Sequence, residues 1–159
     1  ERTMRILKNI KEQFGHQVNI NVFGCTDEAI FDNNLTSDFE YYNHGVLTRN
    51  QVSGLLRKSH LFIDLSDYQA FGRTGLEAMA CGCVSLVPVF GGTDEYIKHN
   101  ENGFAVDPRD EVEIYNTISK FIDLPVDQKV ELQQQAIDRS QNFSVRKAAI
   151  SEVKLFTNI

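Results

Sequence analysis

Residues 61–88 read LFIDLSDYQAFGRTGLEAMACGCVSLVP, and this stretch decides the fold. Its first five residues form a compact apolar run that predicts a β-strand, and Val84–Pro88 predicts a second one. Between them, a polar loop from Ser66 to Phe71 precedes a helical pattern over Thr74–Cys81. A strand, a helix and another strand in this order indicate a parallel sheet covered by helices.

The rest of the chain repeats this alternation. Apolar spacing predicts further strands at 18–23, 39–42 and 104–106, and a polar surface loop with a short helical turn at 26–38. Helices are expected at 2–14, at 49–59, at 93–98, from Asp110 (with Glu113 in a capping box) to about Ile122, from Asp127, and from the cap Ser144. We therefore predict an α/β fold with a doubly wound, Rossmann-like parallel sheet.

Composition limits the classes of function. The chain has 159 residues, of which 42% are hydrophobic and 24% charged, as expected for one globular domain. Its net charge is −6 and its basic residues are scattered, so the basic stripe that binds nucleic acid is missing. No apolar run approaches the ~20 residues of a transmembrane helix. Three cysteines, Cys25, Cys81 and Cys83, predict free thiols, with Cys81 and Cys83 buried, and a cytoplasmic location.

The predicted fold also places its ligand. In doubly wound sheets, ligands bind beyond the carboxyl ends of the strands, where loops and helix N-termini meet. The candidate loops are 24–27, 43–47, 66–74 and 90–93.

The loop before the helix at 74–81 has the richest chemistry. Gly72 and Gly75 would let the backbone approach a ligand, and the free N–H groups of the helix suit a diphosphate. Arg73 is either a bidentate phosphate contact or a solvated side chain. Glu77 has two interpretations: its carboxylate accepts hydrogen bonds from ribose hydroxyls, or it forms a capping box with Thr74 and binds only backbone N–H.

A longer pattern surrounds this loop. It consists of Ser66, Phe71-Gly72, the string LEAMACG at 76–82, a valine-rich strand, Gly91-Gly92 with Glu95, Asn102-Gly103 and Asp110. The pattern resembles the retaining, nucleotide-sugar-dependent glycosyltransferases of group 1 (glycosyltransferase family 4-like), which include glycogen synthases and sucrose synthases. The resemblance implies the C-terminal, donor-binding domain of the two-domain GT-B fold.

The resemblance also implies roles for individual residues. Glu77 would bind the ribose of the donor nucleotide, and the backbone of 71–76 would contact the sugar and phosphates. The loop after Gly24, together with His44, Gly45 and Leu47, would border the base, although His44 is also typical of a solvated or turn-stabilising histidine. The expected donor-binding set is Ser66, Phe71, Gly72, Arg73, Thr74, Gly75, Leu76, Glu77, Gly24, His44, Gly45 and Leu47.

Two positions depart from the family pattern. The family has two glutamates eight positions apart; the second is Glu77, but the first place holds Gln69. Gln69 can hydrogen-bond the transferred sugar, yet it cannot act as a carboxylate. Arg73 replaces a more common apolar residue, and the string FGRTGLEAMACG at 71–82 resembles enzymes of bacterial surface-polysaccharide assembly, including those that make rhamnose polymers.

The resemblance further implies a domain organisation. Residues 1–159 would form one donor-binding domain without its first strand and without the acceptor-binding N-terminal domain, and would be inactive alone. The helix 144–156 would leave Val153 and Phe156 exposed. The expected partners are a nucleotide-sugar donor and, through the N-terminal domain at the inner face of the membrane, an acceptor glycan or lipid-linked glycan. No Asp-x-Asp signature is present, so no metal and no cofactor other than the donor substrate is expected.

The sequence leaves three alternatives open. A nucleotide-sugar epimerase shares the architecture but as a rule lacks the string at 76–82. A nucleotide-sugar-binding module without catalysis would explain Gln69. A flavodoxin-like receiver module would need a strand-end aspartate with a matching lysine, and no lysine matches Asp64.

Overall fold

The computed structural model describes residues 2–33, 35 and 38–157. Its strands are β1 (Asn21–Val22), β2 (Tyr42–Asn43), β3 (Leu61–Ile63), β4 (Val84–Pro88) and β5 (Phe104–Val106). Its α-helices are α1 (Arg2–Phe14), α2 (Asp27–Asp32), α3 (Arg49–Leu56), α4 (Arg73–Ala80), α5 (Glu111–Asp123), α6 (Val126–Ser140) and α7 (Val145–Thr157). Short 3₁₀ helices are η1 (Gly15–Gln17), η2 (Gly92–Glu95) and η3 (Gln141–Phe143).

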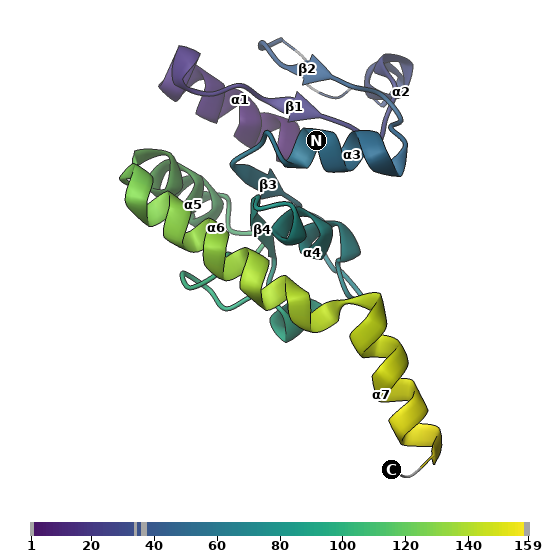
Figure 1. Ribbon diagram of the computed structural model, residues 1–159. Helices are drawn as coiled ribbons and strands as arrows, with labels where there is room; N and C mark the ends of the chain where they lie inside the picture. Colours follow the sequence, from purple (N-terminus) through teal and green to yellow (C-terminus); the bar gives the residue numbers. More distant parts are fainter. Residues whose placement is uncertain (1, 34, 36–37, 158–159) are drawn as a thin grey trace.

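All strand pairs found in the described residues are parallel, which confirms the predicted α/β class. β3, β4 and β5 form one sheet with β4 in the middle, and β1 pairs with β2. The strands expected at 18–23 and 39–42 are only two residues long, and the second is displaced to Tyr42–Asn43. Figure 1 shows β1 and β2 beside α1 and α2, above the layer that holds β3 and β4.

The central strand β4 is buried along its whole length. Its side chains alternate between two cores, because successive residues of a strand point to opposite faces. Val84 and Leu86 pack with apolar residues of α1 and α5, whereas Val87 packs with Met79 of α4 and Ala136 of α6. Helices therefore cover both faces of the sheet, as the sequence predicts.

The helix ends show which capping predictions hold. Asp110 caps α5 by accepting from the Glu113 N–H at 2.9 Å, but the Glu113 carboxylate accepts from the Asp107 N–H instead of closing the expected box. The helix expected at 93–98 is the short η2. The turn expected in the loop 26–38 is α2; residues 34, 36 and 37 of that loop lie outside the described residues.

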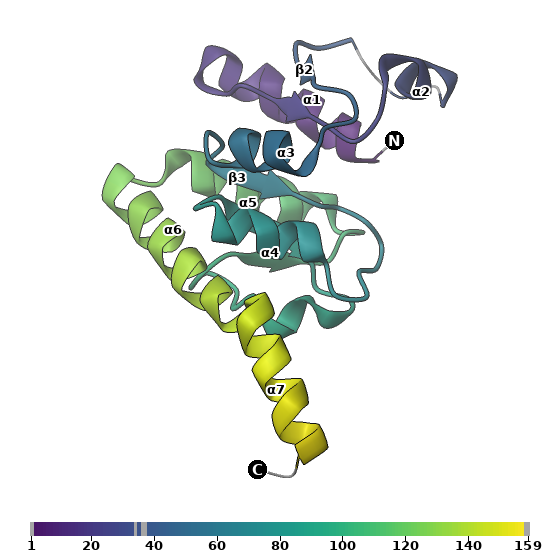
Figure 2. The same cartoon turned by 45° about the vertical axis from the view of Figure 1, so that its right-hand side comes forward.

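The last helix projects from the rest of the molecule, as Figures 1 and 2 both show. Ser144 caps α7 through the Lys147 N–H at 3.3 Å, as expected. Val153 is 60% exposed and Phe156 is 82% exposed, which confirms the predicted apolar surface. None of the helices in the described residues is long and apolar enough to cross a membrane.

The cysteines differ in accessibility, which partly corrects the expectation of two buried thiols. Cys83 is buried, but Cys81 and Cys25 are half-buried. Burial, with a smaller contribution from Cys81, raises the pKa of Cys83 to about 12. Since only the thiolate reacts rapidly, Cys83 is inert near neutral pH.

We expect iodoacetamide at about pH 8 to alkylate Cys25 in the folded protein well before Cys83. Peptide mass spectrometry of samples quenched over time measures both rates, and a sample unfolded in guanidinium gives the reference rate for each thiol. Equal rates for the two thiols in the folded protein would contradict the buried position of Cys83.

Candidate functional site

The helix α4 begins at the edge of the sheet where β3 and β4 end. Gly72 adopts a left-handed conformation (φ 73°) and directs the chain into the helix. The N–H groups of Gly75 and Leu76 both donate to the Gly72 carbonyl, at 3.1 and 3.4 Å. The N–H groups of Arg73 and Thr74 precede these donors, and in the described residues neither has a hydrogen-bond partner. This end of α4 therefore offers donors and a partial positive charge to an anion.

Tyr96 holds this helix start in place. Its hydroxyl donates to the Gly72 carbonyl at 2.7 Å, and a Cβ on Gly72 would lie 2.6 Å from that hydroxyl oxygen. A Cβ on Gly75 would lie 2.9 Å from Val87. Close packing of α4 inside the protein is therefore enough to explain why both positions are glycine. Direct contact of their backbone with a ligand stays a prediction.

Tyr96 is also the residue that sequence reasoning missed at this point. Its burial, with a smaller effect of the Asp64 carboxylate, raises the pKa of Tyr96 to about 12, so the hydroxyl keeps the proton that it donates. The Phe71 ring packs 5.5 Å from the Tyr96 ring and 6.0 Å from that of Phe143, measured between centroids. The side chains of Phe71 and Leu76 therefore both pack, partly buried, against this core cluster.

Glu77 lies one turn into α4 with its carboxylate at the surface. Its Oε1 is 3.7 Å from Arg73 Nη2 and 3.8 Å from Arg49 Nη2, and its side chain is 39% exposed. The cap residue of α4 is Gly72, and none of the side chains that the structure describes caps the helix. The capping-box interpretation of Thr74 and Glu77 is therefore wrong, because the carboxylate faces two guanidinium groups instead of backbone.

Arg49 was not identified from the sequence. It is the first residue of α3, directly after the predicted ligand loop 43–47 and the cap Thr48. Arg49 begins a helix just beyond the end of a strand, and this position could have marked it as a candidate ligand contact. Its pairing with Glu77 could not be predicted, because the two residues are 28 positions apart in the sequence. Arg49 connects the loops at the end of β2 with the start of α4.

The second group of predicted residues lies at the ends of β1 and β2. The Gly24 N–H donates to the Gly45 carbonyl at 2.8 Å, and both glycines have positive φ. The His44 ring nitrogen Nε2 lies 2.8 Å from Asn21 Oδ1, which favours the turn-stabilising interpretation of His44. Leu47 is half-buried next to this turn.

Gln69 lies in a hydrogen-bonded cluster behind α4. Its amide nitrogen donates to Asp64 Oδ2 and to Ser66 Oγ, both at 2.8 Å. Its backbone forms a bridge with Gly91: the Gln69 N–H donates to the Phe90 carbonyl, and the Gly92 N–H donates to the Gln69 carbonyl at 3.0 Å. The sequence singled out Ser66 and Gln69 separately, whereas the structure joins them through Asp64.

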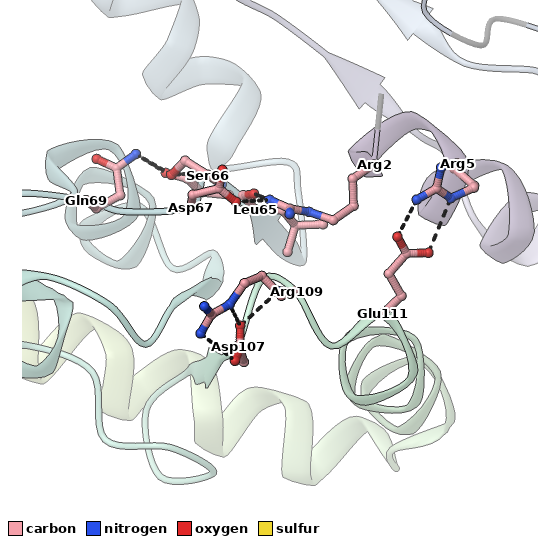
Figure 3. A network of polar contacts seen from close by, with 10 residues as sticks. Arg2, Arg5, Leu65, Ser66, Asp67, Gln69, Asp107, Arg109 and Glu111 are labelled. Carbon is pink, nitrogen blue, oxygen red and sulfur yellow. Dashed lines mark hydrogen bonds and ion pairs between the residues drawn. The ribbon is translucent and has the colours of Figure 1, made fainter.

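Figure 3 shows three ion pairs on one side of this cluster. Arg2 donates to the Leu65 carbonyl at 2.6 Å and to Asp67 Oδ1 at 2.8 Å, which ties α1 to the end of β3. Arg5 pairs with Glu111 of α5. Arg109 pairs with Asp107, and its hydrogen bonds and charge lower the pKa of that carboxyl. In the described part of the chain, no three His, Cys, Asp or Glu side chains gather as a metal site.

Comparison with known sequences identifies relatives. The family model described as "Glycosyl transferases group 1" matches residues 5–143. Sucrose synthase of Nitrosomonas europaea is 32% identical over 100 residues, covering 58% of this chain and 13% of that protein. Mannosylfructose-phosphate synthase of Agrobacterium fabrum is 26% identical over 120 residues, covering 76% of this chain and 22% of that protein. The chain thus spans less than a quarter of the length of either relative.

Solved structures share the fold. HepE of Anabaena, crystallised in complex with UDP and glucose, gives a TM-score of 0.79 at 22% identity, covering 98% of this chain and 44% of that one. Sucrose-phosphate synthase from Thermosynechococcus elongatus gives a TM-score of 0.80 at 21% identity, covering 98% and 41%. These likenesses concern the fold alone.

A substitution at Gly91 tests how much the bridge between Gly91 and Gln69 contributes to stability. A Cβ on Gly91 (φ 112°) would lie 1.8 Å from the Gln69 carbonyl oxygen. We expect Gly91→Ala to lower the free energy of unfolding by about 3 kcal/mol or more, because it combines a strained φ with a backbone clash. Gly45→Ala is the matched control, since Gly45 has φ 63° but open space around the Cβ position. It should cost about 1 kcal/mol. Urea unfolding measures both, and equal losses would contradict the Gln69–Gly91 bridge.

Proposed function

The chain belongs to the group 1 glycosyl transferases, and on that premise we propose that it binds the nucleoside-diphosphate-sugar donor at the amino end of α4. The intact enzyme then transfers the sugar to an acceptor hydroxyl with retained anomeric configuration. One observation supports this proposal: the N–H groups of Arg73 and Thr74, which have no hydrogen-bond partner among the described residues, lie one helical turn from the exposed Glu77 carboxylate. A diphosphate needs hydrogen-bond donors such as these N–H groups, and the ribose attached to it needs an acceptor such as this carboxylate close by.

The diphosphate contacts come from the helix start and from side chains. Negative charge that builds on the leaving diphosphate is stabilised by N–H donors and by the positive end of the helix. Arg73 and Arg49 are 77% and 83% exposed, so both side chains can reorient toward phosphate oxygens. Their contacts with Glu77 are longer than hydrogen bonds and exposed, hence weak, and a bound phosphate replaces them at little cost.

The ribose contact comes from Glu77. An ionised carboxylate accepts hydrogen bonds only, so it suits the two vicinal hydroxyls of a ribose. The glycine turns at Gly24 and Gly45 then border the base. HepE, which shares the fold, was crystallised with UDP and glucose, which makes UDP the first nucleotide to test here.

We extend the proposal to the whole enzyme. The chain would act as the donor-binding domain of a two-domain protein, with an acceptor glycan or lipid-linked glycan held by the other domain. This organisation is supported by the share of the solved structures that the chain covers, 44% and 41%. The string at 71–82 supports a cytoplasmic role in bacterial surface-polysaccharide synthesis.

A second candidate is a nucleotide-sugar-binding module without transferase activity. Gln69 favours it, because an amide replaces the family's carboxylate beside the transferred sugar. The two candidates differ in turnover. A binding screen of UDP, GDP, dTDP and ADP first identifies the preferred nucleotide. Sugar conjugates of that nucleotide are then incubated with the full-length protein, and release of the nucleoside diphosphate is measured. Binding without release in the presence of candidate acceptors would support the module.

Glu77→Gln tests the ribose contact directly. We expect its affinity for UDP to fall about tenfold, since a charged hydrogen-bond acceptor becomes neutral. Glu152→Gln makes the same change on the exposed α7 and should bind like the unmodified protein. Isothermal titration calorimetry measures the affinities.

The same titration with 2′-deoxyuridine diphosphate locates the interaction. The unmodified protein should prefer UDP over the deoxy form, and Glu77→Gln should lose most of that preference. A variant that still discriminates fully between ribose and deoxyribose would show that Glu77 does not contact the sugar ring hydroxyls.

A further inference from the structure

The residue behind Gln69 is Asp64, which directly follows β3. The Asp64 N–H donates to the Leu86 carbonyl of β4 at 2.9 Å, so the backbone is part of the sheet. Its carboxylate accepts three hydrogen bonds: from the Ser66 N–H at 3.0 Å and hydroxyl at 2.7 Å, and from the Gln69 amide nitrogen at 2.8 Å. Asp64 is therefore a fixed acceptor at the edge of the sheet.

This acceptor decides which way the Gln69 amide points. An ionised carboxylate has no hydrogen to donate, so only the NH₂ end of the amide can face it. The Ser66 hydroxyl gives its hydrogen to Asp64 and accepts the second hydrogen of Gln69. Both amide hydrogens of Gln69 are thus used inside the protein.

The carbonyl oxygen of the Gln69 amide, Oε1, is the polar atom of this side chain that is still able to bind a ligand. In the described residues no group donates to Gln69 Oε1, and this atom is not among the buried polar atoms that lack a partner, so solvent reaches it. Figure 3 shows the Gln69 amide with its nitrogen toward Ser66 and its oxygen turned away. Because the Gln69 backbone is tied to Phe90 and Gly92, the oxygen has a defined position.

We propose that Asp64 is a positioning residue: together with Ser66 it holds the Gln69 amide so that its uncharged carbonyl oxygen faces outward and accepts a hydrogen bond from a hydroxyl group of the donor sugar. The sugar contact rests on the proposed function, whereas the orientation of the amide does not. The site is thereby built for a neutral acceptor, not for a second carboxylate.

A glutamate at position 69 is therefore not an equivalent residue. It would place a carboxylate at hydrogen-bond distance from that of Asp64, and two like charges this close cannot both ionise without a large cost. The neighbouring charges already have partners. Arg2 of α1 pairs with Asp67, Arg109 pairs with Asp107, and the Tyr96 hydroxyl is neutral and donates to Gly72.

The first test is the pH dependence of the melting temperature. The Gln69→Glu variant should lose about 4 °C relative to the unmodified protein at about pH 8, where the repulsion between the two carboxyl groups is strongest. The loss should shrink at about pH 5, because a protonated glutamate can donate to Asp64. The control Gln13→Glu, on the exposed face of α1, should show no such pH dependence.

Exchanging the two groups gives the decisive variant. In Asp64→Asn/Gln69→Glu, an amide at position 64 donates to a carboxylate at position 69, so the repulsion is absent and most of the lost melting temperature at about pH 8 should return. Asp94→Asn, a change at an exposed residue of η2, should not rescue Gln69→Glu. A Gln69→Glu variant as stable as the unmodified protein at both pH values, or a double variant without recovery, would overturn the proposal.

The second test concerns the sugar. In Asp64→Asn the amide oxygen can keep the two Ser66 donors, so an NH₂ donor replaces the oxygen that faces Gln69 and no longer holds its amide nitrogen. We therefore expect the affinity for UDP-glucose to fall about tenfold while the affinity for UDP stays unchanged. Equal losses for both ligands would show that Asp64 acts only on general stability and would overturn its positioning role. If neither ligand binds the unmodified protein, the proposed function fails for this donor, and the melting data still decide the orientation of the amide.

Discussion

The contact between α4 and β4 is the constraint on which the candidate site depends. Gly75 lies so close to Val87 that a Cβ would overlap it, and the buried Ser85 hydroxyl donates to the Gly75 carbonyl at 2.7 Å. Tyr96 adds a hydrogen bond from its hydroxyl to the Gly72 carbonyl. Because Gly75 places no side chain against Val87, the helix lies close to the strand at this point, and α4 has little freedom to slide or rotate. Its first N–H groups are consequently held at one place beyond the sheet, and a preorganised site of this kind binds charge without reorganising.

The charged side chains around the start of α4 fall into two groups, an exposed group and a group held by hydrogen bonds at the edge of the sheet. The exposed arginines and Glu77 can exchange partners when an anion with a ribose arrives, since their contacts are long and solvated. At the end of β3, the Asp64 carboxylate accepts three hydrogen bonds of 2.7–3.0 Å, and through Gln69 it turns a neutral oxygen outward. The proposed donor site therefore combines mobile charges for the diphosphate and ribose with a fixed, uncharged acceptor for the sugar.

Local sequence signals predicted much of this fold. The apolar runs before and after residues 66–81 gave the two strands around α4 because burial on both faces demands continuous apolar residues. Asp110 and Ser144 were found as caps because a cap depends only on the next three residues. The failures are two contacts between distant segments and one contact across the irregular loop that follows β3. Glu77 faces Arg49, Gln69 faces Asp64 and Gly72 accepts from Tyr96, and no local spacing encodes these pairs. The glycines were recognised, but one sequence cannot say whether a missing Cβ makes room for a ligand or for a core side chain.

The most direct test of the account is to observe the backbone N–H groups at the start of α4 while nucleotide is added. In ¹⁵N-labelled protein titrated with UDP, we expect the amide signals of Arg73 and Thr74 to shift most and their hydrogen exchange to slow, while signals of α7 stay in place. If calorimetry records binding but the amides of Arg73 and Thr74 do not respond, the phosphates bind elsewhere and the proposed donor site is wrong.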